Sequence, residues 1–378
     1  MLQEGDFMKK VAIITLQGCN YGNRLQNYAV QQQFKNKGVE VYTLKNTNLL
    51  NSKKYGIKNN LKLFLSILKS EICRNGVYRF TNSILTTKRV KKFLEFNKKY
   101  INFSSRIFSF NRNTNYDLYV VGSDQVWNPY FGLGDLGLLS INIPDYKKIA
   151  FSASIGVNTI PTSFKEKFTN ELKKFSFISV REDKAKDIIG ELVDRDDVQV
   201  LVDPTMLLSA QEWDKIACRP SQLDNIKEEK FILNYFLGEL SEKRKKEIER
   251  VAQENNCNII NILDKNDPFY SSGPSEFLYL EKHAFLICTD SFHSCVFAIL
   301  YNRPFVVFDR EQNNMEKMNS RIETLLSKFK LKNRMYNGNN ITKHNLEHDY
   351  SEAYSILEKE RIKSNLFIDK SLNQKKSN

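Results

Sequence analysis

The sequence lacks any apolar run that approaches the roughly 20 residues needed to cross a bilayer. Its first seven residues carry acidic side chains instead of the apolar stretch of a secretory signal. The six cysteines form neither a CxxC pair nor a regular framework, and the loop at 18–24, after the first expected strand, matches neither GxGxxG nor the Walker pattern. These absences exclude a disulfide scaffold, and at that loop a dinucleotide-binding fingerprint and a P-loop, and we expect a reduced, cytoplasmic protein.

Apolar residues are plentiful. Of the 378 residues, 41 % are hydrophobic and 12 % aromatic, which is enough to build real cores and excludes a wholly disordered chain. At roughly 100–200 residues per domain, this length favours two domains. No internal repeat is visible in the sequence.

The net charge of +13 is carried by one segment. Residues 51–116 contain 15 lysines and arginines but only two acids, Glu71 and Glu95, so the rest of the chain is neutral. Two groups of apolar residues recur at helical spacing among its lysines: Leu61, Phe64, Leu65 and Leu68, then Val90, Phe93, Leu94 and Phe96. This pattern predicts two amphipathic helices, each with a basic face.

Three roles for this basic segment 51–116 are open. Basic amphipathic helices suit an anionic membrane surface or a lipid-linked acceptor. Single-stranded RNA would need aromatic rings exposed on a sheet, whereas these aromatics lie on apolar helix faces. The third role is a plainly solvated surface. Nucleic acid fits least, and we expect no nucleic-acid partner.

Short apolar runs alternate with helical patterns along most of the chain. The expected strands are Val11–Leu16, Val39–Leu44, Leu118–Val121, Ile149–Ser154, Phe177–Val180, Val198–Val202, Phe231–Phe236, Asn258–Leu263, Ala284–Cys288 and Phe305–Phe308. The expected helices are 25–37, 163–174, 182–191, 241–254, 275–282, 292–301, 318–329 and 350–363. This alternation predicts an α/β fold of two Rossmann-like domains that face a cleft.

A polar stretch at residues 219–229 interrupts the alternation and is typical of a linker. We therefore expect an N-terminal domain at 8–218, which includes the basic segment 51–116, and a C-terminal domain at 230–345. A C-terminal helix and tail, 346–378, follow, and the helix could pack back on the first domain.

Polar loops after apolar strands are the places to search for a site, because ligands of open parallel sheets bind beyond the carboxyl ends of the strands. The first such loop, 18–24, leads into a helix whose N–H groups could hold an anion. The second, 122–128, places glycine, an acid, amides and a tryptophan directly after a strand. Such polar density favours a ligand site over a purely structural turn.

Arg181 follows an apolar strand at the start of an expected helix, where a cation opposes the helix dipole. That position favours the binding of an anion. The structural alternative is an ion pair with Asp183 or Asp203.

The second half of the chain offers Thr289-Asp290-Ser291-Phe292-His293-Ser294, where a strand gives way to a helix. Asp290, Ser291 and His293 lie too close in sequence to form a hydrolase triad, and Ser291 fits a helix N-cap. His293 is a candidate general acid or base, because its unperturbed pKa lies near neutrality.

In this order, the blocks resemble the polysaccharide pyruvyl transferase family from residue 10 to about residue 335. The resemblance rests on residues 20–29, 122–129, 154–156, 179–182, 203–205, 289–294 and 320–321, and the blocks Gly-Ser-Asp-Gln-Val-Trp-Asn and Ser-Phe-His are its most specific parts. It implies two Rossmann-like domains similar to the GT-B glycosyltransferase arrangement. It also implies transfer of pyruvyl from phosphoenolpyruvate to two hydroxyls of a sugar in a cell-surface glycan precursor, as a ketal.

The implied chemistry needs no metal and no cofactor besides the donor substrate. Arg181 would bind the carboxylate or phosphate of phosphoenolpyruvate, and His293 would protonate its methylene carbon. Asp290 or Asp124 would orient His293 or take the proton of the sugar hydroxyl, and the helix opening at Ser291 would hold the phosphate. The expected substrate-binding residues are Asn20, Tyr21, Gly22, Asn23, Arg24, Gly122, Ser123, Asp124, Gln125, Trp127, Asn128, Ser154, Gly156, Ser291, Ser294 and Arg321.

One position departs from the family. Members often carry arginine two residues before this histidine, and this chain has Ser291. Arg24 or Arg321 could replace that cation. Two alternatives therefore remain: a GT-B-like glycosyltransferase with a nucleotide-sugar donor, whose ribose Glu276 could bind, and a non-catalytic protein that binds glycan or nucleic acid. With family membership, the basic segment 51–116 is best interpreted as facing the acceptor or the inner face of a membrane.

Overall fold

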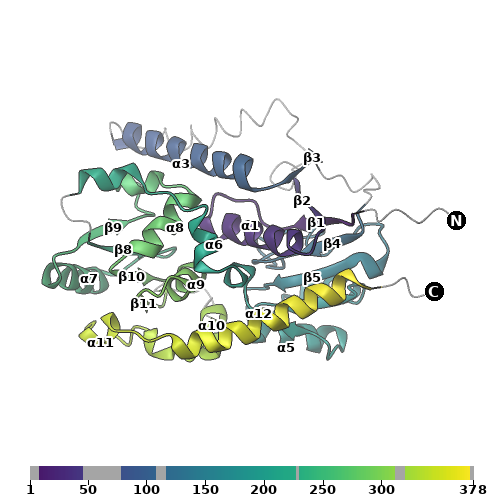
Figure 1. Cartoon of the computed structure of the whole chain (residues 1–378). Coiled ribbons are helices and arrows are strands. Elements are labelled where there is room, and N and C mark those ends of the chain that lie inside the picture. The colour runs from purple at the N-terminus through teal and green to yellow at the C-terminus, as the bar shows by residue number, and fades with distance from the viewer. Residues whose placement is uncertain (1–7, 46–77, 108–115, 227–229, 311–319, 375–378) are drawn as a thin grey trace. The chain divides into compact units, whose positions relative to one another are not determined.

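The computed structural model of the chain describes residues 8–45, 78–107, 116–226, 230–310 and 320–374 (Figure 1). These residues form two compact units. The first unit comprises those up to residue 45, those of 100–208 and those from 356 onward, and the second comprises 78–99 and those of 209–355. Each unit contains one parallel β-sheet, which confirms the α/β class with two Rossmann-like domains. That the domains face a cleft stays a prediction.

The sheet of the first unit has seven strands in the order β3-β2-β1-β4-β5-β6-β7, all parallel. The strands are β1 Lys10–Ile14, β2 Glu40–Lys45, β3 Phe103–Ile107, β4 Leu118–Val121, β5 Lys148–Ala153, β6 Phe177–Val180 and β7 Gln199–Val200. The order reverses between β1 and β4, and a ligand of such a sheet binds beyond the carboxyl ends of the strands at that reversal.

Helices cover both faces of this sheet, because successive side chains of a strand point to opposite faces. Phe151 of β5 packs edge-on against Phe34 of α1, whereas its neighbour Ala150 belongs to the core beneath α4 and α5. The helices are α1 Tyr21–Lys35, α4 Thr162–Leu172 and α5 Asp183–Val193. The core of the unit therefore lies on both sides of the sheet.

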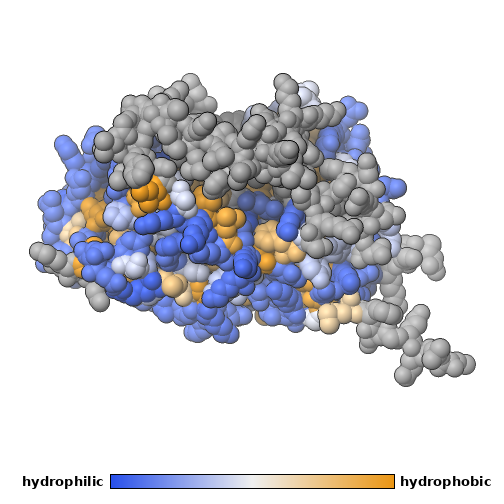
Figure 2. Space-filling view, turned by 90° about the horizontal axis from the view of Figure 1, so that it is seen from above, coloured by the Kyte–Doolittle hydropathy of each residue, from blue (hydrophilic) through white to orange (hydrophobic). Residues whose placement is uncertain are grey.

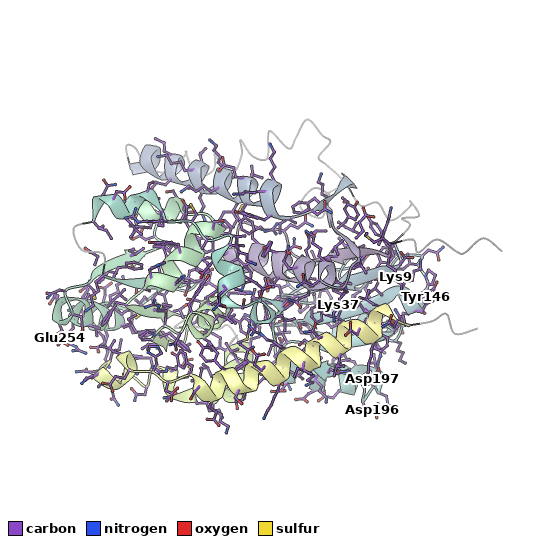
Figure 3. The ribbon with its side chains drawn as sticks, viewed as in Figure 1. Lys9, Lys37, Tyr146, Asp196, Asp197 and Glu254 are labelled. Atoms are coloured by element: carbon purple, nitrogen blue, oxygen red, sulfur yellow. The ribbon has the colours of Figure 1, made fainter. Side chains whose placement is uncertain are left out.

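The last helix, α12 Ser351–Leu372, contributes most of its length, from residue 356 onward, to the first unit. Phe367 stacks on Phe151 with ring centroids 5.9 Å apart. Lys37, which is labelled in Figure 3 and follows the end of α1, pairs with Asp369 at 2.8 Å. The prediction that the last helix packs back on the first domain is confirmed for this part of it.

The sheet of the second unit has four parallel strands in the order β11-β10-β8-β9. The strands are β8 Phe231–Tyr235, β9 Asn258–Asn261, β10 Leu286–Thr289 and β11 Phe305–Val307. Its helices are α3 Tyr78–Tyr100 up to Lys99, α6 Ala210–Asp214, α7 Glu242–Glu254, α8 Pro274–His283, α9 Phe292–Leu300, α10 Ser320–Lys328, α11 Lys343–Leu346 and the start of α12. Here the strand order reverses between β8 and β10.

The helix predicted around Val90–Phe96 is confirmed as part of α3. Arg89, on its buried side, lies 5.1 Å from the ring centre of Tyr270 and donates a 3.1 Å hydrogen bond to the carbonyl of that residue. One basic residue therefore anchors the helix inside the second unit instead of facing solvent. The other predicted basic helix, around Leu61–Leu68, lies outside the described residues.

Three local expectations are corrected. Helix α1 begins at Tyr21 instead of residue 25, because Tyr21 is completely buried and this packing outweighs the flexibility of Gly22. The basic segment 51–116 contains a strand of the sheet, β3, which its charge pattern concealed. The strand expected at Val198–Val202 is only two residues long. No helix of the described residues is both long and apolar enough to span a membrane.

Replacing Phe367 by alanine tests the packing of α12. Phe367 is 2 % exposed and touches two aromatic rings, so the cavity should lower the free energy of unfolding by about 3–5 kcal/mol. Its neighbour Leu366 is 55 % exposed, and Leu366→Ala should change the free energy of unfolding by about 0.5 kcal/mol or less. Urea unfolding of both variants measures the difference, and equal losses would contradict this packing.

Candidate functional site

The reversal point of the first sheet brings together two of the polar loops expected from the sequence. Asn23, in the first turn of α1, donates a hydrogen bond from its side-chain amide to the carboxylate of Asp124, which follows β4. Asp124 is 4 % exposed and also accepts a 2.8 Å hydrogen bond from the backbone N–H of Gln125. The expected loops after β1 and β4 are therefore neighbours, joined by a buried carboxylate.

Gly122 allows the second loop to leave the sheet. Its φ is +117°, and a Cβ atom would lie 2.3 Å from the carbonyl oxygen of Phe151, so no larger residue fits. The next residue, Ser123, is completely buried, and its hydroxyl reaches the carbonyl of Ser152 at 2.8 Å and Asp203 at 3.0 Å. These two loop residues serve the architecture of the site.

Arg181 lies at the centre of this cluster, directly after β6. Its guanidinium donates to Asp203 at 2.5 Å and reaches Asp124 at 3.5 Å, and its side chain is 1 % exposed. Burial alone would lower the pKa of Arg181, but the carboxylates of Asp203, Asp124 and Glu182 outweigh it and raise the pKa. Of the two ion pairs left open by the sequence, the one with Asp203 is present, and Asp183 is exposed.

Glu182 belongs to the block 179–182 but was expected to have no role of its own, and it organises the loop after β5. Its carboxylate accepts hydrogen bonds from the Ser154 hydroxyl at 2.9 Å and from the N–H groups of Ile155 and Gly156 at 3.0 and 3.2 Å. The expected residues Ser154 and Gly156 are thus brought to the cluster by a buried acid. Its signals in the sequence are its position beside Arg181 and its place in the block 179–182.

Four other expected residues of the first unit lie in the interior. Arg24 is 1 % exposed and donates to the carbonyl of Leu16 at 2.8 Å, and burial lowers its pKa to about 10 against the opposing charges of Cys19 and Asp124. Tyr21 and Gly22 are buried in α1, and Trp127, 1 % exposed, donates from its indole to the carbonyl of Gly137 at 2.7 Å. Because these residues are buried, they can position the loops of a ligand site without contacting the ligand.

Three expected residues hold the ends of the two loops. Asn20 occupies the N-cap position of α1 in an extended conformation, without a side-chain cap. Asn128, which is buried, donates from its side chain to Gln125 at 3.3 Å and accepts from the backbone N–H of Tyr130 at 3.0 Å. Gln125 is half-buried and is therefore closer to the surface than Asn128.

The second unit has a carboxylate at its own reversal point. Asp290, after β10, accepts hydrogen bonds from the N–H groups of Leu237 and Gly238 at 2.7 and 2.8 Å, just beyond β8. Arg310, after β11, donates to the same carboxylate at 3.0 Å and keeps 22 % of its side chain exposed. Sequence reasoning missed Arg310; an arginine three residues beyond an apolar strand was the available signal.

Helix α9 begins beside this carboxylate. Ser291 is its N-cap residue, with no side-chain cap, and its N–H donates to the hydroxyl of Thr289 at 3.0 Å. His293 lies in the first turn, is 6 % exposed and packs edge-on against Phe292. Asp290, Ser291 and His293 therefore occupy one short stretch at the carboxyl edge of the second sheet, as expected.

Ser294 faces the interior and meets a buried acid. Its hydroxyl donates to Glu281 of α8 at 2.6 Å, and both residues are completely buried. Burial raises the pKa of Glu281 well above its ordinary value, with the Ser294 hydrogen bond opposing it. Glu281 was missed; its signal was an acid four residues after Phe277 on the apolar face of a helix.

Arg321 and Glu276 lie elsewhere in the second unit. Arg321 is 7 % exposed in the first turn of α10. Glu276 accepts from the N–H of Gly273 at 2.6 Å and pairs with Lys92 of α3, so its carboxylate is already engaged at the start of α8. This engagement disfavours Glu276 as the ribose-binding acid of a nucleotide-sugar enzyme. Within the described part of the chain, no group of three His, Cys, Asp or Glu side chains is placed to hold a metal ion.

The buried acid predicts a pH effect on stability. Because Glu281 stays protonated in the folded state above the pH at which it ionises when unfolded, folding binds a proton there, and stability falls as pH rises from about 4.5. Glu281→Gln cannot ionise and should remove this loss, so its stability relative to the wild type rises with pH. Urea midpoints of both proteins between pH 4 and pH 8 measure it. Parallel pH profiles would show that Glu281 ionises normally.

Comparison with known proteins assigns the family. A family model described as polysaccharide pyruvyl transferase matches residues 20–312, whereas none of the curated proteins compared with the chain matches it.

Among solved structures, UDP-GlcNAc 2-epimerase from Neisseria meningitidis, bound to UDP-GlcNAc, has 11 % identity and a TM-score of 0.46, and the similarity covers 97 % of this chain and 99 % of the epimerase. MurG from Acinetobacter baumannii has 12 % identity and a TM-score of 0.40, with 97 % and 100 % covered. These low scores assign neither activity nor ligand. The family model matches more than half of the chain, including every described strand except β1, and the chain belongs to the polysaccharide pyruvyl transferase family of transferases.

Proposed function

We propose that the protein transfers pyruvyl from phosphoenolpyruvate to a sugar of a cell-surface glycan precursor and forms a ketal. Family membership supports a pyruvyl transfer onto a glycan. The observation that carries the site is the start of α9, where His293 follows a carboxylate that already holds an arginine. No feature of the described residues favours the nucleotide-sugar alternative specifically.

The donor carries a phosphate and a carboxylate, and the second unit offers two groups for anions. The N-terminal turn of α9 presents backbone N–H groups, and its N-cap side chain does not occupy them. Arg310 adds a partly exposed guanidinium beside Asp290. Arg310 is therefore our candidate for the cation that the family often places two residues before the histidine, in preference to the buried Arg24.

The reaction requires a proton donor. His293 would protonate the methylene carbon of the donor, which becomes a methyl group and leaves a cationic centre at C2. One sugar hydroxyl attacks C2, the C2–O bond to phosphate breaks, and a second hydroxyl closes the ketal. Of the two hydroxyl protons, one restores His293 and the other leaves with phosphate. Asp290, held by two N–H groups, would keep Arg310 and the start of α9 in place.

Arg181 would act differently from the expectation. Because two carboxylates already neutralise it, a donor anion could bind there only by displacing one of them. We therefore assign it a positioning role for Asp124 and Asp203, and its role as a direct donor ligand stays a prediction. The role of Asp124 toward the sugar hydroxyl stays a prediction as well.

Phosphate release from phosphoenolpyruvate in the presence of lipid-linked sugars tests the reaction. His293→Ala should lower kcat by roughly 100- to 10,000-fold, the usual contribution of a general acid. Arg310→Ala should mainly raise KM for phosphoenolpyruvate. His283, exposed on α8 of the same unit, supplies the control, and His283→Ala should leave both constants unchanged. Equal rates for the wild type and His293→Ala would contradict the mechanism.

We also propose that this enzyme works in the cytoplasm at an anionic membrane surface. The outer side of α3 exposes Lys88, Lys91, Lys98 and Lys99 with one acid, Glu95, and also Ile84 and Leu94, 41 % and 60 % exposed. Charged lysines around projecting apolar side chains suit anionic headgroups, because the lysines bind phosphate and the apolar groups enter the interface. A lipid-linked acceptor would lie on the same surface.

Charge reversal at Lys88, Lys91 and Lys98 tests this surface. At roughly 1 kcal/mol per lysine, the triple change to glutamate should weaken binding to phosphatidylglycerol vesicles by about a hundredfold or more. Lys165, Lys186 and Lys246, exposed elsewhere, provide a control of equal charge. Sedimentation with vesicles measures binding, and phosphatidylcholine vesicles should bind neither protein. Equal losses of vesicle binding in the two variants would show that only the net charge of the protein matters, and would contradict a specific surface on α3.

A further inference from the structure

Two large aromatic side chains project from the first unit directly after the motif that ends at Asn128. Tyr130 is 74 % exposed and its neighbour Phe131 is 51 % exposed. Exposed single apolar residues are common on protein surfaces, but two adjacent aromatic rings form a patch that water solvates poorly. On the face drawn in Figure 2, hydrophobic residues lie among mainly hydrophilic ones. The mechanism proposed above uses neither ring.

The turn that carries these rings is firmly held. The side-chain oxygen of Asn128 accepts from the N–H of Tyr130 at 3.0 Å, and its backbone oxygen accepts from Gly132 at 2.8 Å. The N–H of Leu133 donates a hydrogen bond to the carbonyl of Val126 at 3.0 Å. A Cβ on Gly132 would lie 2.5 Å from the Asn128 oxygen, so the turn closes only with glycine there. The motif thus fixes the backbone that presents both rings to solvent.

A shallow cavity of about 140 Å³ lies against this turn. Tyr130 and Phe131 form part of its wall, and Phe164 of α4 forms another part. Asp135 and Lys167, paired with each other and about half exposed, supply its charged groups. It is smaller than the roughly 300–1,000 Å³ of pockets that enclose drug-sized ligands, so it suits one ring of a longer molecule.

We propose that this aromatic turn, residues 128–132, binds one pyranose ring of the glycan acceptor. A pyranose presents C–H groups on its faces and hydroxyls around its edge. Its faces match Tyr130 and Phe131, and its hydroxyls match the carboxylate and ammonium of Asp135 and Lys167. The inference rests on the proposed function for the glycan's identity as acceptor, but binding itself requires no turnover.

A glycan is favoured over a lipid surface by the composition of the cavity. A membrane interface accommodates exposed aromatics, but the charged pair Asp135 and Lys167 beside them would lose water there without gaining hydroxyl partners. A sugar ring supplies both the apolar faces and the polar edge. A membrane is therefore an outcome of the test and not the proposed ligand.

The test uses the full-length protein and an array of immobilised oligosaccharides that end in glucose, galactose, mannose, N-acetylglucosamine or N-acetylmannosamine. The double change Tyr130→Ala with Phe131→Ala should raise the dissociation constant for the bound glycans by about tenfold or more, whereas Tyr130→Phe should retain binding because the ring remains. Ile362→Ala with Leu366→Ala removes two side chains that are 62 % and 55 % exposed on α12, and should bind like the wild type. Thermal unfolding verifies that all variants fold.

Each outcome has one interpretation. Loss of binding in the aromatic double variant alone supports the site. Unchanged binding in that variant overturns it, as does a wild type that binds no glycan on the array, or a double variant that loses only vesicle binding. Donor-dependent phosphate release is measured in parallel, so failure of the glycan site with release intact overturns this inference and leaves the proposed transfer standing.

Discussion

The buried ion pair between Arg181 and Asp203 is the interaction on which the first unit depends. Neither side chain is more than 1 % exposed, and removing either would leave a charge without compensation in a medium of low dielectric constant. Asp203 also holds Ser123 and Thr205, and Asp124 on the other side of Arg181 holds Asn23. Loops that follow four different strands are thereby tied to one another by charge.

The two sheets share one topological feature, a carboxylate at the point where the strand order reverses, but its surroundings differ between the units. In each, a carboxylate lies where the strand order reverses, since that is where two loops diverge and leave backbone N–H groups to be satisfied. In the first unit, Asp124 and its arginine are enclosed. In the second, Asp290 is bound by N–H groups and by Arg310, which stays partly exposed next to an uncapped helix start. Of these two paired arginines, the one in the second unit is therefore the more exposed to solvent.

The excess positive charge acquires a structural meaning in α3. Arg89 faces inward, where its guanidinium covers the rings of Phe93 and Tyr270, and Lys92 reaches Glu276. The remaining lysines described on this helix point outward. One helix therefore uses its basic residues in two ways: those on the inner side anchor it through their apolar stems and hydrogen bonds, and those on the outer side define its surface.

The alternation of strands and helices and the family could be predicted from the sequence, because each depends on periodicity or on residues adjacent in the chain; the segments that carry the site stay a prediction. The start of α1 and the strand β3 escaped it, since burial of Tyr21 and pairing with β2 outweigh local glycine and charge. The contacts of the site residues are visible only in the folded chain. Arg181 is paired, and Trp127 lies in the core. Arg310 and Glu281 contact Asp290 and Ser294, at the start of α9. Ion pairs and burial bring together residues that are far apart in the chain, so no local sequence pattern predicts which carboxylate a given arginine will pair with.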